Sequence, residues 1–146
     1  MKIQVKDDVV NIIDNVDFPT LIKENVERAF LDGRADDPFY VCNLGDVVQK
    51  HLLWRLKFPR IEVFYAMKCN PTEIIVKLLA KLGVGFDCAS KTEIAHVLDC
   101  GVTPDRIIYA NTCKQASHIK YAETHGVKMI TFDSVAELHK IKTFHS

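Results

Sequence analysis

The stretch EVFYAMKCNPTEIIVKLLAKLGVGFDCAS, residues 62–90, has the pattern of one complete strand–helix–strand unit. It begins with a short and continuously apolar run, which is typical of a parallel strand buried on both faces. Apolar residues then recur at the 3.6-residue period of a helix, at Ile74, Ile75, Leu78, Leu79 and Leu82. A second apolar run begins at Val84. This order of segments predicts a β-α-β crossover within a parallel sheet.

The same pattern repeats along the rest of the chain. Apolar runs begin at residues 62, 84, 106 and 128, at a constant spacing of 22 residues. The helical segments that follow the later runs again carry apolar residues on one side: Ile94, Val97 and Leu98, then Ala116, Ile119 and Ala122, then Val135, Leu138 and Ile141. Four consecutive β-α units joined by short right-handed crossovers build either a doubly wound sheet or a barrel.

Residues that favour helix ends lie where these units need them. Asn70 followed by Pro71 predicts an N-cap with proline at the first helical position. Two S-x-x-E capping boxes predict the starts of later helices, at Ser90 with Glu93 and at Ser134 with Glu137. Glycines at positions 83, 101 and 126 stand where the first three helices are expected to stop.

The chain before residue 62 has a different pattern. FPTLIKENVERAF, residues 18–30, predicts an amphipathic helix, and DGRADDP, residues 32–38, predicts a polar linker. FYVCNLGDVVQKHLLWRL, residues 39–56, predicts a short strand followed by a helix. We therefore divide the chain into a helical segment with a linker over residues 1–37 and an α/β domain over residues 38–146, with its first β-α unit from about residue 62.

The composition is that of one soluble globular domain. The 146 residues are 48% hydrophobic and 26% charged, and the formal net charge is zero, which gives no reason to expect a nucleic acid or an acidic membrane surface as partner. No apolar run approaches the roughly 20 residues that span a bilayer. The N-terminus has acids where a signal peptide would be apolar, so we expect a cytoplasmic protein.

The cysteines and histidines show no metal-binding pattern. The five cysteines form no C-x-x-C pair and their number is odd, which argues against a zinc site or a disulfide framework and favours reduced thiols. We interpret Cys69, Cys88 and Cys113, near predicted strand ends, as small core residues. The six histidines lack H-E-x-x-H spacing and are interpreted as solvated: His51, His96, His118, His125, His139 and His145.

Polar residues follow each predicted strand, and parallel α/β folds place ligands at that end. They are Lys68, then Asp87 and Ser90, then Asn111, then Asp133 and Ser134. The two-residue period of a strand would put Glu62, Phe64, Ala66 and Lys68 on one face. If that face points inward, Ala66 leaves room beside Lys68 for a flat ligand, with Asp87 one strand over.

Each candidate residue also has a structural interpretation. Lys68 is either a lysine that extends over the strand end toward water or a lysine that forms a covalent imine with a carbonyl cofactor. Asp87 is equally suited to begin a loop, and Glu93 is satisfied by its capping box. The residues alone leave these alternatives open.

Four stretches of the sequence resemble a known family, and this resemblance favours the functional interpretation of these residues. FYAMKCN, GFDCASKTEI, RIIYANTCKQASHIKYA and TFDSVAEL resemble the N-terminal half of the barrel of eukaryotic ornithine decarboxylases, and PFYVCNLGDVVQKH resembles the segment before it. The resemblance runs from about residue 38 to the end. It implies an alanine-racemase-like fold, in which a (β/α)₈ TIM-type barrel is followed by a β-domain, and a homodimer. We expect the N-terminal half of such a barrel, which four strands cannot close, preceded by a short α/β segment.

The resemblance also implies the cofactor and the roles of four residues. The cofactor is pyridoxal 5'-phosphate, Lys68 matches the imine lysine, and Ala66 matches a small residue next to the cofactor. Asp87 and Glu93 match acidic residues near the imine and the ring. The apolar strand end is expected to desolvate Lys68 and so to favour the neutral amine that attacks the cofactor aldehyde.

The function implied is conversion of L-ornithine to putrescine and CO₂ in polyamine biosynthesis. The family's phosphate loop, ring-nitrogen partner and stacking histidine would follow Ser146, so we expect a fragment or truncated form that is inactive alone. One alternative is a regulatory protein like the antizyme inhibitors, which tend to lose the acid at the position of Asp87. Another is a small stand-alone pyridoxal-phosphate barrel. For antizyme we expect a surface over residues 116–142, with Lys120, Lys128, Lys140 and Lys142.

Overall fold

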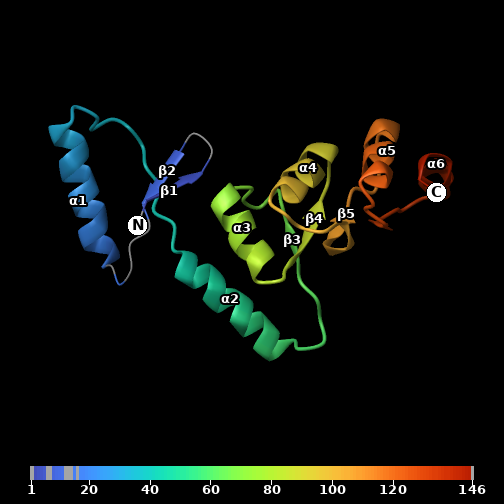
Figure 1. Cartoon of the computed structure of the whole chain (residues 1–146), viewed down its shortest axis with the longest axis horizontal. Coiled ribbons are helices and arrows are strands. Elements are labelled where there is room, and N and C mark those ends of the chain that lie inside the picture. Colours follow the sequence, from blue (N-terminus) through green and yellow to red (C-terminus); the bar gives the residue numbers. More distant parts are fainter. Residues whose placement is uncertain (1, 6–7, 12–14, 16, 146) are drawn as a thin grey trace. The chain divides into compact units, whose positions relative to one another are not determined.

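The structure is a computed structural model that describes residues 2–5, 8–11, 15 and 17–145 (Figure 1). The chain forms two compact units, Met1–Leu44 and Gly45–Ser146. In the first unit, β1 (Lys2–Val5) and β2 (Asp8–Asn11) pair as an antiparallel hairpin, with Lys2 opposite Asn11. Helix α1 (Phe18–Leu31) follows. The sequence analysis did not predict the hairpin.

Helix α1 confirms the predicted amphipathic helix. Asp17 is its N-cap, and the Asp17 carboxylate accepts a hydrogen bond from the N–H of Thr20 at 3.1 Å. Because the first N–H groups of a helix have no partner within the helix, this bond fixes where α1 begins.

The predicted strand before the next helix is wrong. Residues 39–43 have no strand conformation and pair with no strand in the described part of the chain, and the Tyr40 side chain is fully exposed. A strand is held by a ladder of hydrogen bonds to a neighbour, and apolar composition alone does not supply one. The predicted helix that follows is confirmed as α2 (Leu44–Lys57).

Four parallel strands form the sheet of the second unit, in the order β3-β4-β5-β6. They are β3 (Phe64–Ala66), β4 (Gly85–Cys88), β5 (Ile107–Tyr109) and β6 (Met129–Ile130). Each is followed by a helix: α3 (Glu73–Lys81), α4 (Lys91–Asp99), α5 (Ala116–Thr124) and α6 (Val135–Phe144), with a short 3₁₀ helix η1 (Pro104–Arg106) before β5. The four predicted β-α units are confirmed.

The strand order decides between the two predicted architectures. A doubly wound sheet reverses its strand order, whereas the four described parallel strands follow one another in sequence without reversal. Right-handed crossovers in one direction place all the helices on the same face of the sheet. This is the winding of a barrel, and the described strands make up part of one.

The two faces of this sheet differ in burial as that winding requires. One face carries the buried core side chains Met67, Phe86, Cys88, Ile107 and Tyr109, and the helices contribute buried apolar residues such as Val76, Ile94 and Ile119. On the other face Ala66, Asp87 and Ile108 are only half-buried and Met129 is exposed. We call this second face the open face.

The predicted helix stops are confirmed, and the predicted start of the first sheet helix is wrong. Gly83, Gly101 and Gly126 follow α3, α4 and α5 with φ values of +84°, +83° and +76°, the left-handed conformation that ends helices. Helix α3 starts at Glu73 with Thr72 as its N-cap, not at Asn70. The Asn70 carboxamide instead accepts from the N–H of Thr72 at 3.0 Å, so it forms a turn before the helix.

Of the two hydrogen bonds that define a capping box, the one to the serine hydroxyl is confirmed in both predicted boxes. The hydroxyl oxygens of Ser90 and Ser134 accept hydrogen bonds from the N–H groups of Glu93 and Glu137, each at 3.2 Å. Neither carboxylate forms the reciprocal bond of a capping box, to the N–H of its own serine. Both form other contacts, which bear on the candidate site.

Three predictions about burial are wrong in part. Of the predicted core cysteines only Cys88 is buried, because Cys69 and Cys113 lie in turns beyond the strand ends and are exposed. Among the histidines, His51, His96, His118 and His145 are half-buried rather than solvated. In α6 the predicted apolar stripe is partly exposed, at Val135 and Leu138, since α6 buries Glu137 there instead.

Candidate functional site

Lys68 lies just past the carboxyl end of β3. The strand ends at Ala66, and a turn follows in which the N–H of Cys69 donates to the Ala66 carbonyl at 3.0 Å. The N–H of Met67 donates to the Asp87 carbonyl at 3.0 Å, which ties this turn to β4. Met67 is buried and Lys68 is exposed.

This placement corrects two expectations about Lys68. Glu62 and Lys68 are not part of the strand, which is shorter than predicted, so strand alternation does not set the direction of the Lys68 side chain. The expected desolvation of Lys68 is also wrong for this structure, because the side chain is exposed.

Ala66 and Asp87 lie side by side on the open face. They are direct partners in the register of β3 with β4. Met67 and Lys68 follow Ala66 in the chain. One carboxylate oxygen of Asp87, Oδ1, is buried and has no hydrogen-bond partner among the described residues. Buried polar atoms without partners are uncommon in folded proteins, so this oxygen needs an explanation. The structure therefore brings Lys68, Ala66 and Asp87 to one corner of the sheet.

An aromatic ring lies on the same face, two register pairs nearer the start of the strands. Phe64 is the partner of Gly85, and a Cβ atom added at Gly85 would stand 2.7 Å from two carbon atoms of the Phe64 ring. Only glycine lets the ring approach the sheet this closely. The sequence analysis missed this contact, although a glycine inside a predicted strand is a signal for one.

Glu93 holds the loop that follows β4. Its Oε2 accepts a hydrogen bond from the N–H of Ala89 at 2.5 Å. Next to this loop, burial, together with the nearby carboxylates of Glu93 and Asp87, raises the pKa of the Cys88 thiol to about 12. Cys88 therefore stays a protonated thiol at neutral pH, and Glu93 acts on the backbone of the loop.

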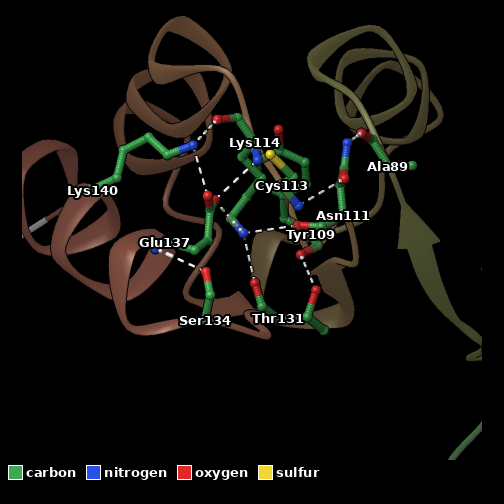
Figure 2. A network of polar contacts seen from close by, with 9 residues as sticks. All are labelled: Ala89, Tyr109, Asn111, Cys113, Lys114, Thr131, Ser134, Glu137 and Lys140. Carbon is green, nitrogen blue, oxygen red and sulfur yellow. Dashed lines mark hydrogen bonds and ion pairs between the residues drawn. The ribbon is translucent and has the colours of Figure 1, made fainter.

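A polar network follows β5 and β6, and Figure 2 shows it with Lys114 at its centre. The Lys114 ammonium donates to the carbonyls of Asn111 at 2.8 Å and Thr131 at 2.6 Å, and it lies 2.9 Å from Oε1 of Glu137. The Lys114 side chain is fully buried. Since an ammonium has three N–H donors, all three are used. The sequence analysis did not predict a buried lysine here, and a charged residue type gives no such signal.

Glu137 is the anion of this network. Its Oε1 accepts from the N–H of Lys114 at 3.0 Å, and the Lys140 ammonium lies 2.6 Å from its Oε2. Burial alone would raise the pKa of Glu137, but hydrogen bonds from Lys140 and Lys114 outweigh it and lower the pKa to about 2. Lys140 also donates to the Lys114 carbonyl at 2.7 Å, so its ammonium takes part in the network.

The described residues contain no group of three or more histidine, cysteine or acidic side chains that could hold a metal ion. Among those same residues, none of the helices has the length and apolar character needed to cross a bilayer.

Comparison with known proteins places the chain in a family. Residues 44–146 match the sequence profile of the pyridoxal-binding domain of pyridoxal-dependent decarboxylases. The chain belongs to this family. It is 59% identical over 109 residues to antizyme inhibitor 2 of Xenopus laevis and, to the same extent, to ornithine decarboxylase of Rattus norvegicus. Each match covers 75% of this chain and 24% of the relative, so the chain spans about a quarter of their length.

A solved structure supports the same fold. A lysine decarboxylase of Selenomonas ruminantium in complex with PLP and cadaverine superposes with a TM-score of 0.78 at 35% identity. The match covers 90% of this chain and 33% of that one. The family and the shared fold confirm the predicted partial barrel of an ornithine decarboxylase-like chain.

Proposed function

We propose that the chain carries the cofactor lysine of an ornithine decarboxylase, and that Lys68 holds pyridoxal 5'-phosphate covalently through its Nζ. One observation carries this proposal. An exposed lysine, Lys68, lies just past the carboxyl end of a parallel strand, two residues after Ala66, and the register partner of Ala66 is Asp87, which has a carboxylate oxygen without a partner among the described residues. Ligands of parallel α/β folds bind at this end of the strands.

The residues present fit such a cofactor. Ala66 has no bulk beyond its Cβ, so it leaves room on the open face for a flat ring, and the Phe64 ring offers an apolar contact next to it. The buried Lys114 is a poor competitor for an aldehyde, since its three N–H donors are already used. Among these two lysines, Lys68 is therefore the available nucleophile.

The chain's own residues have distinct roles in this proposal. The Lys68 ammonium must give up a proton before Nζ has a lone pair to bond to a carbonyl carbon, and the carbonyl oxygen leaves as water. In this proposal Oδ1 of Asp87, which has no hydrogen-bond partner among the described residues, would hold a proton or balance positive charge near that nitrogen. Glu93 keeps the loop after Asp87 in place. When bound, the cofactor supplies an electron sink for the electron pair left as CO₂ departs.

A segment exchange tests the proposal. The 109 matched residues of the rat ornithine decarboxylase are replaced by those of this chain, and release of CO₂ from ornithine is measured. We expect the chimera to be active, its Lys68→Ala variant to lose at least about a hundredfold, and a control at the exposed Lys81 to be unaffected. A correctly dimerised chimera no faster than its Lys68→Ala variant would refute the assignment.

A regulatory role is the second candidate. The chain is as similar to antizyme inhibitor 2 as to a decarboxylase, whereas its Asp87 favours the decarboxylase. An antizyme surface over residues 116–142 would use the exposed Lys120, Lys128 and Lys142. Reversing the charges of Lys120 and Lys142 should then weaken an antizyme pull-down at low salt, and Lys81→Glu should not. If the wild type, the Lys120/Lys142 charge-reversal variant and Lys81→Glu all bind antizyme equally well, this surface is excluded.

Ornithine as the substrate, the homodimer, the cytoplasmic location and the domain boundary near residue 38 stay predictions within this proposal. The substrate prediction is tested by the segment exchange, and the dimer by the oligomeric state of the same protein.

A further inference from the structure

The loop after β4 is held on both sides of one residue. The N–H of Ala89 donates to Glu93 within the same β-α unit, and the carbonyl of Ala89 accepts from Nδ2 of Asn111, in the next unit, at 3.1 Å (Figure 2). Both the N–H and the carbonyl of Ala89 are therefore hydrogen-bonded to side chains. Asp87 lies only two residues before this clamped position, at the end of β4.

Asn111 is itself fixed by its neighbours. Its side-chain Oδ1 accepts from the N–H of Cys113 at 3.2 Å, while its Nδ2 donates to Ala89. Because one bond needs an acceptor and the other a donor, the two bonds fix which way the carboxamide points. The backbone carbonyl of Asn111 accepts from the buried Lys114 ammonium at 2.8 Å.

Lys114 extends this series of contacts to the next strand. Its ammonium also donates to the carbonyl of Thr131, which directly follows β6, at 2.6 Å. The contacts run from Thr131 through Lys114 and Asn111 to Ala89, and so cross the carboxyl ends of β6, β5 and β4. Figure 2 shows these residues linked in that order.

We infer that Asn111 and Lys114 are positioning residues for Asp87. They hold the loop after β4 from the two following units, and they thereby fix the carboxylate at the candidate cofactor site. Neither residue is assigned a contact with the cofactor. The inference rests on the proposed function in one respect, namely that Asp87 and Lys68 form the cofactor site.

Two variants separate this inference from a general effect on stability. Asn111→Asp is nearly isosteric; it keeps the acceptor for Cys113 but loses the donor to Ala89. Thr131→Val is the matched control, because it removes a hydroxyl that lies 3.5 Å from the Tyr109 carbonyl and leaves the Thr131 carbonyl that Lys114 uses. Lys114→Met, studied below its unfolding transition, removes the link to β6.

The first measurement needs no cofactor. Amide hydrogen exchange is followed by mass spectrometry in the peptide that covers residues 87–91 of the full chain. We expect exchange about tenfold faster in Asn111→Asp and Lys114→Met, and unchanged in Thr131→Val, because the loop opens more often when its clamp is lost. The peptide that covers β3 should exchange at the wild-type rate in Asn111→Asp. Unchanged exchange at residues 87–91 in Asn111→Asp would overturn the inference.

The second measurement reports on the site. Pyridoxal 5'-phosphate is titrated and trapped with borohydride, and the modified fraction at Lys68 is measured. We expect Asn111→Asp to need about tenfold more cofactor for half-modification, and Thr131→Val to match the wild type. Faster loop exchange with unaltered trapping would reduce Asn111 to a structural residue and overturn the inference. If the wild-type chain is not modified at Lys68, the proposed function is contradicted. In that case the rate of amide hydrogen exchange at residues 87–91 alone tests whether Asn111 and Lys114 hold the loop.

Discussion

Lys68 and Lys114 are two lysines beyond strands of the same sheet, and they are in opposite environments. Lys68 is exposed at the end of β3, whereas Lys114 is fully buried and bonded to two carbonyls and a carboxylate. Residue type alone does not separate them. The motif around Lys68 identified it by resemblance, but the burial of Lys114 depends on Glu137 and Thr131, which come close only when β5 and β6 pair.

We predict that Lys114→Met destabilises the chain substantially. It leaves the Glu137 carboxylate buried with Lys140 as its remaining cation, and removing one member of a buried ion pair costs about 3–5 kcal/mol. Urea denaturation measures the loss of unfolding free energy. The double variant Lys114→Met/Glu137→Leu should recover part of it, since no buried charge is then left. A wild-type midpoint for Lys114→Met would contradict the buried network.

The low pKa of Glu137 predicts an acid-dependent stability. The pKa falls from an ordinary 4.5 to about 2 in the folded chain, so the unfolded state binds a proton first as the pH drops. The contribution of Glu137 is therefore fully present above about pH 4.5 and is lost as the pH falls toward 2. Unfolding free energies measured across this range should fall less steeply in Glu137→Gln. Equal slopes in both proteins would exclude the ion pair as the cause.

At the scale of helices and strands, local signals predicted the ends of helices better than their contacts. The serine caps and the stop glycines lie where the sequence placed them, because each acts on backbone groups within a few residues. The carboxylates of Glu93 and Glu137 do not complete their capping boxes, since the Ala89 N–H and the lysines of the network offer other partners. The strand predicted before α2 failed because pairing is not a local property.

Gly85 gives a prediction about β4. An added methyl group at this position would stand 2.7 Å from the Phe64 ring and 3.2 Å from the Arg106 carbonyl oxygen, so the ring must move. Overpacking of this kind costs about 1–3 kcal/mol. Gly85→Ala should therefore unfold at lower urea, and Phe64→Leu/Gly85→Ala should regain part of the loss. If Gly85→Ala matches the wild type, the ring does not lie against Gly85.

At the scale of the whole chain, the spacing of 22 residues was enough to predict four β-α units but not how they wind. The sequential strand order, the buried face and the open face come from the structure. The candidate site likewise has one part that the sequence predicted and one part that only the structure shows. Lys68, Ala66 and Asp87 were identified from the sequence and lie together, whereas the clamp on Ala89 joins residues 22 positions apart and needed the folded chain.

We predict that the isolated 146-residue chain does not decarboxylate ornithine. Its described sheet has one open face, and groups that act together in catalysis are not additive, so part of a site retains little activity. Release of labelled CO₂ from carboxyl-labelled ornithine by the purified chain should equal that of Lys68→Ala. Turnover on the order of 1 s⁻¹, within the usual enzyme range, would show that the described residues suffice.

The most direct test of the cofactor site is the position of the covalent label. The purified chain is incubated with pyridoxal 5'-phosphate, reduced with borohydride, digested, and mapped by mass spectrometry. The account predicts that the modification lies on Lys68, that the buried Lys114 stays unmodified, and that Lys68→Arg abolishes the label without transferring it elsewhere. Label on Lys91 or Lys114 in place of Lys68, or spread evenly over the exposed lysines, would contradict it.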